Sequence, residues 1–192
     1  MVLPNTLLFP DSLLPLFLFE PRYREMLAWA LENDRMVSIA LIRKGRTDWS
    51  SPDDFHHVAG LGLVRACVGH EDGTSHLILQ GLARVEFTGF EQMHPFPIAK
   101  LREIPVIGAM SQEAVTLSAI VLELCARLRA SGLDIPDALD TQLAQAPDAG
   151  VLSDLVAHTL VRDPYRRQSV LETGDVTARL HALISHLRDE LS

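Results

Sequence analysis

The hydrophobic pattern of the chain changes near residue 105, and this change limits the possible fold more than any other feature. From Leu3 to about Ile104, short apolar runs alternate with turn-forming residues, which is typical of β-strands. After Gly108, apolar residues recur every three or four positions, as they do on one face of an α-helix. We therefore expect an α+β fold with a strand-rich subdomain at residues 1–107 and a helical subdomain at residues 108–192.

One helix is predicted inside the strand-rich half. It begins at Pro21, because the fixed φ of proline suits the first turn of a helix, and it runs to Asn33. Its expected buried face consists of Tyr23, Met26, Leu27, Ala30 and Leu31. The strand-rich subdomain should therefore contain a single inserted helix.

Short apolar runs around this helix predict a meander of strands. The runs cover residues 36–42, 58–68, 76–82, 84–90 and 98–104, and a polar stretch at 45–54 predicts a loop. Asp72 and Gly73 predict a hairpin turn, since glycine tolerates the positive φ of a tight turn. A meander of short strands favours a barrel-like sheet.

Three glycines, Gly60, Gly62 and Gly81, lie within or at the end of these predicted strands. A glycine inside a strand often marks a bend or the close approach of another backbone segment. A phosphate-binding loop is the alternative, but no helix start follows any of the three. We therefore predict a structural role for these glycines.

Helices are predicted throughout the second half. The first follows Ser111, a good capping residue, and ends near Gly132, which can adopt the left-handed conformation that often terminates a helix. The others cover residues 137–146 and 152–160, begin at Pro164, and follow the capping residue Asp175. Together they predict a small helical bundle.

The formal net charge of -8 argues against nucleic acid as a partner, because nonspecific affinity for phosphates comes mainly from clustered Lys and Arg. The densest basic spot is Arg166 and Arg167, which could contact a partner or RNA. Asp163 and Glu172 are close enough in sequence to pair with it. A solvated helix face is therefore the preferred interpretation of this spot.

No membrane span is expected, since the longest apolar stretches, such as residues 13–19, are shorter than the roughly 20 residues that a bilayer requires. No Lys or Arg precedes Arg22, so the basic region of a secretory signal is lacking. We expect a cytoplasmic protein. Cys67 and Cys125 are then expected to be free, buried thiols, because reducing compartments disfavour disulfides.

His56 and His57, preceded by Asp53 and Asp54, are the best metal-ligand candidates by composition. Adjacent side chains of a strand point to opposite faces, so both imidazoles could hold one ion only in a loop. We interpret them as solvated loop residues and expect neither a metal nor a cofactor. No catalytic residue is assigned either, because no Gly-x-Ser-x-Gly elbow occurs and burial suppresses cysteine reactivity.

The segment Glu20, Pro21, Arg22, Tyr23 and Arg24 allows two interpretations. It could be a polypeptide-recognition patch, in which Arg22 pairs with a carboxylate and Tyr23 offers a flat contact surface. In the structural alternative, which we favour, Glu20 caps the helix, Tyr23 fills the core and Arg22 ties the helix to the sheet by an ion pair. The two roles are compatible, because a rigid element makes a good platform for contacts.

Residues 9–24, Phe-Pro-Asp-Ser-Leu-Leu-Pro-Leu-Phe-Leu-Phe-Glu-Pro-Arg-Tyr-Arg, closely resemble the start of the N-terminal domain of Lon proteases, the peptidase S16 family. Similar segments follow in the family's order at residues 60–64, 72–73, 81–85, 95–99, 152–157, 167–173 and 175–180. The resemblance implies a PUA-like β pseudo-barrel followed by a helical bundle. It also implies binding of unfolded or tagged polypeptides, which are delivered to an attached unfoldase.

The chain departs from a complete Lon protease in two respects. It has no Gly-x-x-x-x-Gly-Lys-(Ser/Thr) motif to hold ATP phosphates, and its length leaves no room for the Ser-Lys protease domain. We expect a non-catalytic polypeptide-binding or adaptor protein that uses an apolar groove between barrel and helices. The alternatives are an RNA-binding PUA-like protein and a small-substrate hydrolase without a recognisable motif.

Overall fold

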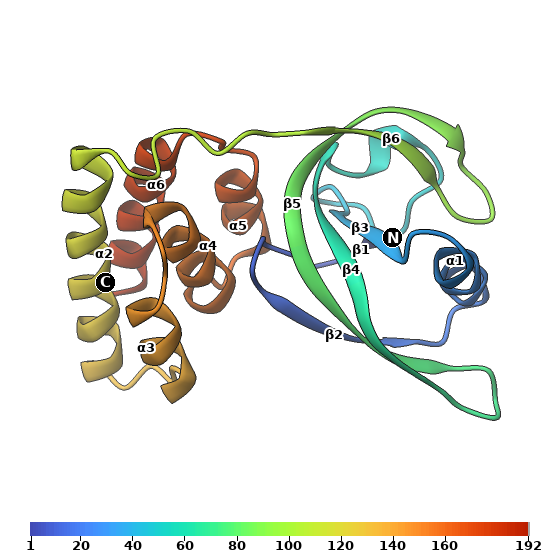
Figure 1. Cartoon of the computed structure of the whole chain (residues 1–192), viewed down its shortest axis with the longest axis horizontal. Helices are drawn as coiled ribbons and strands as arrows, with labels where there is room; N and C mark the ends of the chain where they lie inside the picture. Colours follow the sequence, from blue (N-terminus) through green and yellow to red (C-terminus); the bar gives the residue numbers. More distant parts are fainter. Residues whose placement is uncertain (192) are drawn as a thin grey trace. The chain divides into compact units, whose positions relative to one another are not determined.

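The computed structural model describes residues 1–191, which form two compact units that divide between Ile104 and Pro105 (Figure 1). Among the described residues, every strand lies in the first unit, and every helix except α1 and the short η1 lies in the second. The predicted α+β fold is therefore confirmed. The finer descriptions stay predictions: domains at 1–107 and 108–192, a PUA-like pseudo-barrel and a helical bundle.

The first unit, Met1–Ile104, is called the β unit and contains a six-stranded sheet. Its strands are β1 (Val2–Leu3), β2 (Leu13–Leu18), β3 (Met36–Leu41), β4 (Val58–Gly69), β5 (Ser75–Gln92) and β6 (Ile98–Glu103). Their order is β1-β3-β4-β5-β2, with β6 also paired to β5; β1 is parallel to β3 and the other pairs are antiparallel. Figure 1 shows β4 and β5 as long, strongly curved strands.

The longest strand corrects one prediction, because the separate strands expected at 76–82 and 84–90 are a single strand, β5. Leu61 of β4 pairs with Ala83 and Gly62 pairs with Gly81, so Leu82 is the extra residue of a bulge. A bulge bends a strand without ending it. The first part of β5 can therefore pair with β2 and the last part with β6.

Helix α1 (Pro21–Glu32) begins with Pro21 in the first turn, as predicted, and ends one residue before the expected end, with Asn33 as its C-cap. Its buried side chains, Tyr23, Met26, Leu27 and Ala30, belong to one hydrophobic cluster with side chains of the sheet. The prediction that Leu31 is also buried is wrong: its side chain is 37% exposed at the edge of the helix's apolar face. The predicted loop at 45–54 is present and ends in a 3-10 turn, η1 (Pro52–Asp54).

The predicted role of the strand glycines is confirmed by a backbone segment that lies directly against them. Leu8 and Phe9 are fully buried. A Cβ atom at Gly60 would lie 1.8 Å from the carbonyl oxygen of Leu8, and one at Gly81 would lie 1.8 Å from that of Phe9. Only glycine fits such contacts between two backbones.

The second unit, the α unit, contains the predicted helices in their predicted order. They are α2 (Gln112–Ala130), α3 (Asp137–Ala144), α4 (Ala149–Leu160), α5 (Pro164–Leu171) and α6 (Val176–Glu190). The side chains of Ser111 and Asp175 cap α2 and α6 as expected. Helix α4 begins three residues earlier than expected, because Asp148 accepts a hydrogen bond from the N–H of Val151 and caps it there.

A buried ion pair in the α unit was not predicted. The side chain of Arg179 in α6 is fully buried, and its Nη1 lies 2.9 Å from Oδ1 of Asp154 in α4. The guanidinium also donates hydrogen bonds to Ser153 Oγ at 3.0 Å and to the carbonyl oxygens of Thr173 and Gly174 at 3.1 and 3.4 Å. Such a dense set of partners compensates for the desolvation of the two charges.

Candidate functional site

Tyr23, the central residue of the segment 20–24, is a core residue. Its side chain is 2% exposed, and its hydroxyl donates a hydrogen bond to the carbonyl oxygen of Val2. Nε1–H of Trp49 donates to the same hydroxyl at 3.2 Å. Burial raises the pKa of Tyr23 above its ordinary value. The structure therefore gives Tyr23 the core position of the structural interpretation.

Arg22 fastens α1 to the loop that precedes η1. Its Nη2 lies 2.7 Å from Glu20 Oε2 and 3.0 Å from Asp48 Oδ1, and its guanidinium lies over the ring of Trp49. The pKa of Asp48 is lowered mainly by a hydrogen bond from the backbone N–H of Trp49, and Arg22 lowers it further. Glu20 occupies the N-cap position, but its side chain makes no capping hydrogen bond, so the prediction that it caps the helix is wrong. The carboxylate of Glu20 accepts a hydrogen bond from Arg22 instead.

Arg24 contacts the tip of the β4–β5 hairpin. Gly73 has a positive φ of 79°, as predicted for the turn, and a Cβ atom there would lie 1.8 Å from Arg24 Nη2. The guanidinium therefore packs directly against the glycine. These contacts support the structural role of the segment, and its direct contact with polypeptides stays a prediction.

Exposed apolar side chains form a continuous surface on the outer face of β2, β4 and β5. We call this surface the apolar strip, and its members are Leu13, Pro15, Phe17, Phe19, Ala66, Val68 and Ile78. Phe19 and Val68 are 62% and 61% exposed. These side chains contribute to the surface of the β unit instead of its core.

The strand register places the members of the strip side by side. Two rows cross the three strands, Phe17–His76–Val68 and Pro15–Ile78–Ala66. Directly opposite residues of neighbouring strands point to the same face. The ring centroids of Phe17 and His76 are 4.7 Å apart, and those of Phe17 and Phe19 are 6.1 Å apart. The strip is therefore a single surface drawn from three strands.

Strand β2 is apolar on both of its faces, which is unusual for a strand with one exposed face. Leu14, Leu16 and Leu18 alternate with the strip residues and pack with the core. Outward positions of such a strand are normally polar. The signal was present in the apolar run at 13–19, which has no charged residue and is interrupted only by Pro15.

A shallow hollow of about 470 Å³ lies on the strip. Among the described residues that line it, there is no Asp, Glu, Lys or Arg. An exposed apolar surface of this kind can bury apolar side chains of a partner, which is the usual driving force of protein association.

A smaller cavity of about 150 Å³ lies beside α1 in the β unit. Its described lining is mainly apolar and aromatic, with Asp34 and Ser38 as the polar side chains that a hydrolase could use. The carboxylate of Asp34 accepts a hydrogen bond from the N–H of Met36 at 3.0 Å. The cavity therefore gives no specific support to the hydrolase alternative.

Asp54, one of the two acidic residues of the metal candidate, has a structural role. Asp54 accepts hydrogen bonds from the backbone N–H groups of Ser50 and Ser51, which lower its pKa to about 2. His57 lies in the following segment with its Nε2 3.1 Å from the carbonyl oxygen of Pro52. Within residues 1–191, no group of three or more His, Cys, Asp and Glu side chains is placed to hold a metal ion.

The basic spot at 166–167 has an acidic partner in another helix. Arg166 Nη1 lies 3.0 Å from Asp189 Oδ2 in α6. The carboxylate of Asp163 instead caps α5 by accepting hydrogen bonds from the N–H groups of Tyr165 and Arg166.

No helix of the described chain has both the length and the apolar character needed to cross a membrane.

Both cysteines are free thiols, but only Cys125 is buried; Cys67 is half-buried, contrary to expectation. Burial raises the pKa of Cys125 to about 11.

We therefore expect iodoacetamide at pH 8 to modify Cys67 first, with Cys125 at least tenfold slower, because only the thiolate reacts. Peptide mass spectrometry over time measures both rates, and equal rates in the folded protein would contradict the placement of Cys125.

Comparison with known proteins agrees with this geometry. Residues 1–189 match the substrate-binding domain of the ATP-dependent protease La (LON). A Lon protease of Koribacter versatilis is 28% identical over 189 residues, which cover 97% of this chain and 23% of that protein. The N-terminal domain of a Mycobacterium avium complex Lon protease superposes with a TM-score of 0.77 at 18% identity, covering 98% of this chain and 96% of that domain. The Lon N-terminal domain protein from Xanthomonas campestris superposes with a TM-score of 0.67 at 16% identity, with coverages of 96% and 95%.

Proposed function

Because the chain belongs to the family of LON substrate-binding domains, we propose that it binds unfolded or tagged polypeptides without catalysing a reaction on them. It covers about a quarter of the Lon proteases that it matches, 23% of one and 24% of another. The ATPase and protease activities of those complete proteins are not part of our proposal. We do propose that a partner unfoldase or protease receives the bound polypeptide.

The apolar strip is the observation that carries this proposal. Unfolded polypeptides differ from folded ones mainly by the apolar side chains that they expose. The strip offers Phe17, Phe19 and Val68 to such side chains; hydrogen-bonded strands hold Phe17 and Val68, and Phe19 directly follows β2. A rigid surface binds with a smaller loss of conformational entropy than a flexible loop does.

We assign a supporting role to the segment of Glu20, Pro21, Arg22, Tyr23 and Arg24. Arg24 packs against Gly73, at the tip of the hairpin that carries Val68 and His76. Arg22 and Tyr23 hold the same helix through Asp48 and Trp49. The segment therefore keeps one end of the strip in position, and the apolar groove that we expected between barrel and helices remains a separate prediction.

A cytoplasmic location is part of the proposal, supported by the two free thiols, Cys67 and Cys125. RNA binding is not proposed, because the net charge of -8 opposes it and the described lining of the hollow on the strip contains no Lys or Arg.

The proposal is tested by titrating the chain against a fluorescently labelled polypeptide that is kept unfolded by reduction and carboxymethylation. Fluorescence anisotropy should show saturable binding with a Kd of about 10 μM, which is typical of a small apolar contact surface. The same polypeptide in its native, disulfide-bonded form should bind at least tenfold more weakly. A failure of the unfolded form to saturate at about 100 μM, or equal affinity for both forms, would contradict the proposal.

A further inference from the structure

We propose that His70 and His76 form a two-imidazole site for a divalent transition-metal ion on the β4–β5 hairpin. Nε2 of His70 lies 2.7 Å from Nδ1 of His76, and both side chains are exposed. His76 belongs to β5, opposite Val68, while His70 begins the turn with its N–H bonded to the carbonyl oxygen of Thr74. The backbone of a tight hairpin therefore holds the two ring nitrogens together.

The separation of the two nitrogens is close to that of two ligands on one metal ion. Metal–nitrogen bonds of about 2.05 Å place two ligand nitrogens about 2.9 Å apart at a right angle and about 3.3 Å apart at a tetrahedral angle. The observed 2.7 Å is closest to the right-angled case. Imidazole nitrogens suit Cu²⁺ and Ni²⁺, and the affinity of such sites for divalent ions is highest at Cu²⁺, so these two ions are the probes of choice.

The hydrogen-bonded pair is the metal-free form of the same arrangement. One imidazole N–H now donates to the nitrogen of the other ring. When an ion binds, the donor ring changes tautomer: its N–H proton passes through water to its other ring nitrogen, so both imidazoles stay neutral and each offers one lone pair to the ion. The ring planes are nearly perpendicular, at 87°, and rotation of the exposed His70 side chain would turn its lone pair toward an ion bound at Nδ1 of His76.

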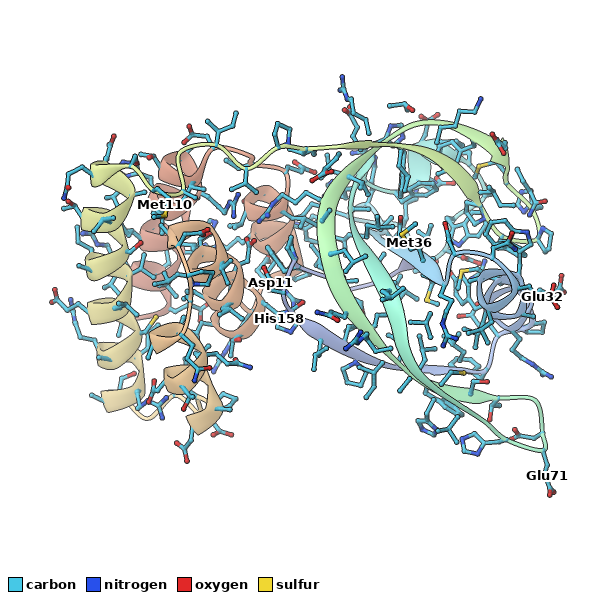
Figure 2. The ribbon with its side chains drawn as sticks, viewed as in Figure 1. Asp11, Glu32, Met36, Glu71, Met110 and His158 are labelled. Carbon is cyan, nitrogen blue, oxygen red and sulfur yellow. The ribbon has the colours of Figure 1, made fainter. Side chains whose placement is uncertain are left out.

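Neighbouring residues restrict the ligand set to the two imidazoles. The carboxylate of Asp72 already accepts hydrogen bonds from the N–H and hydroxyl of Thr74 at 2.9 and 2.7 Å. Figure 2 shows Glu71 pointing away from the chain at the tip of the hairpin. Both carboxylates still favour a cation nearby, while water or a partner side chain completes the coordination.

The ring of His76 also lies against Phe17 of the apolar strip, tilted by 35° with centroids 4.7 Å apart. This contact limits the rotation of His76 and favours one position of its Nδ1. A bound ion would in turn fix Phe17 and the end of the strip. The metal site stands on its own geometry and does not depend on polypeptide binding.

The test adds Cu²⁺ or Ni²⁺ to the untagged, full chain and records isothermal titration calorimetry and ¹H–¹⁵N NMR spectra. We expect one ion per chain, and paramagnetic Cu²⁺ at substoichiometric amounts should broaden the signals of residues 68–77 first. His70→Gln keeps a hydrogen-bonding group but removes a ligand, so it should weaken binding at least tenfold, as should His76→Gln. His181→Gln, at an exposed histidine of α6, is the matched control and should change the affinity less than twofold.

Three results would overturn the proposal: no binding of either ion at about 0.1 mM, an affinity unchanged by His70→Gln, or first broadening elsewhere, for example at His56 and His57. The NMR experiment uses the unmodified chain, so its outcome does not depend on whether a variant folds.

Discussion

Replacing Gly81 by alanine should lower the free energy of unfolding of the β unit by about 3 kcal/mol, because the new methyl group has no room. Its Cβ atom would lie 1.8 Å from the carbonyl oxygen of Phe9 and 3.2 Å from Cα of Pro10. Both are backbone atoms of a buried segment that also bonds to this strand, since Asp11 N–H donates to the carbonyl oxygen of Gly81. Relief of the contact therefore requires that the segment move away from the sheet.

Gly89 provides the matched control in the same strand. A Cβ atom at Gly89 meets nothing within 4 Å, so Gly89→Ala should change the unfolding free energy by less than about 1 kcal/mol. Urea unfolding followed by tryptophan fluorescence measures the effect, because both tryptophans, Trp29 and Trp49, lie in the β unit. Equal urea midpoints for the two variants would show that the close backbone approach at Gly81 is absent.

Replacing Arg179 by methionine should destabilise the α unit by about 3–5 kcal/mol, since it leaves the carboxylate of Asp154 buried without its cation. Asp154 is 3% exposed and Arg179 is fully buried, so water does not replace the lost partner. The carbonyl oxygens of Thr173 and Gly174 lose donors in the same step. The effect combines the loss of the Arg179 charge beside a buried carboxylate with the loss of hydrogen bonds.

Two further variants separate the ion pair from general effects on the helices. Arg129→Met removes pairs with Asp137 and Asp140, but these carboxylates are exposed, so the loss should stay below about 1 kcal/mol. The double change of Arg179→Met with Asp154→Leu removes both charges and should recover part of the stability. Circular dichroism at 222 nm during urea unfolding measures the helices. A double variant no more stable than Arg179→Met alone would contradict the buried-charge explanation.

The sequence predicts most of the elements because their signals are local. The helix starts at Pro21, Ser111 and Asp175 depend on residues within one turn, and all three were predicted correctly. The break expected between residues 82 and 84 was wrong, because a bulge at Leu82 lets the strand continue. Whether a glycine-containing segment ends a strand or bends it depends on its partners in the sheet, which local sequence does not specify.

The candidate functional site was harder to predict than the helices and strands, because it depends on which distant segments pair with one another. The apolar strip depends on the register that brings Phe17, His76 and Val68 into one row, although they come from distant segments. The pairing of Arg179 with Asp154 also joins two helices. In both cases the sequence contains a local signal, which is an apolar residue at an outward position or a charge on an apolar helix face. It does not show which distant residue that side chain contacts.

The central claim is that the apolar strip binds unfolded polypeptides, and one pair of valines tests it most directly. Val68 in the strip and Val115 in α2 are both exposed, at 61% and 55%, so replacing either by serine removes a similar apolar area from the surface. We predict that Val68→Ser raises the Kd for the carboxymethylated polypeptide about threefold to tenfold, whereas Val115→Ser leaves it unchanged within error. Equal affinities of the two variants, or a loss confined to Val115→Ser, would show that polypeptides bind elsewhere on the chain.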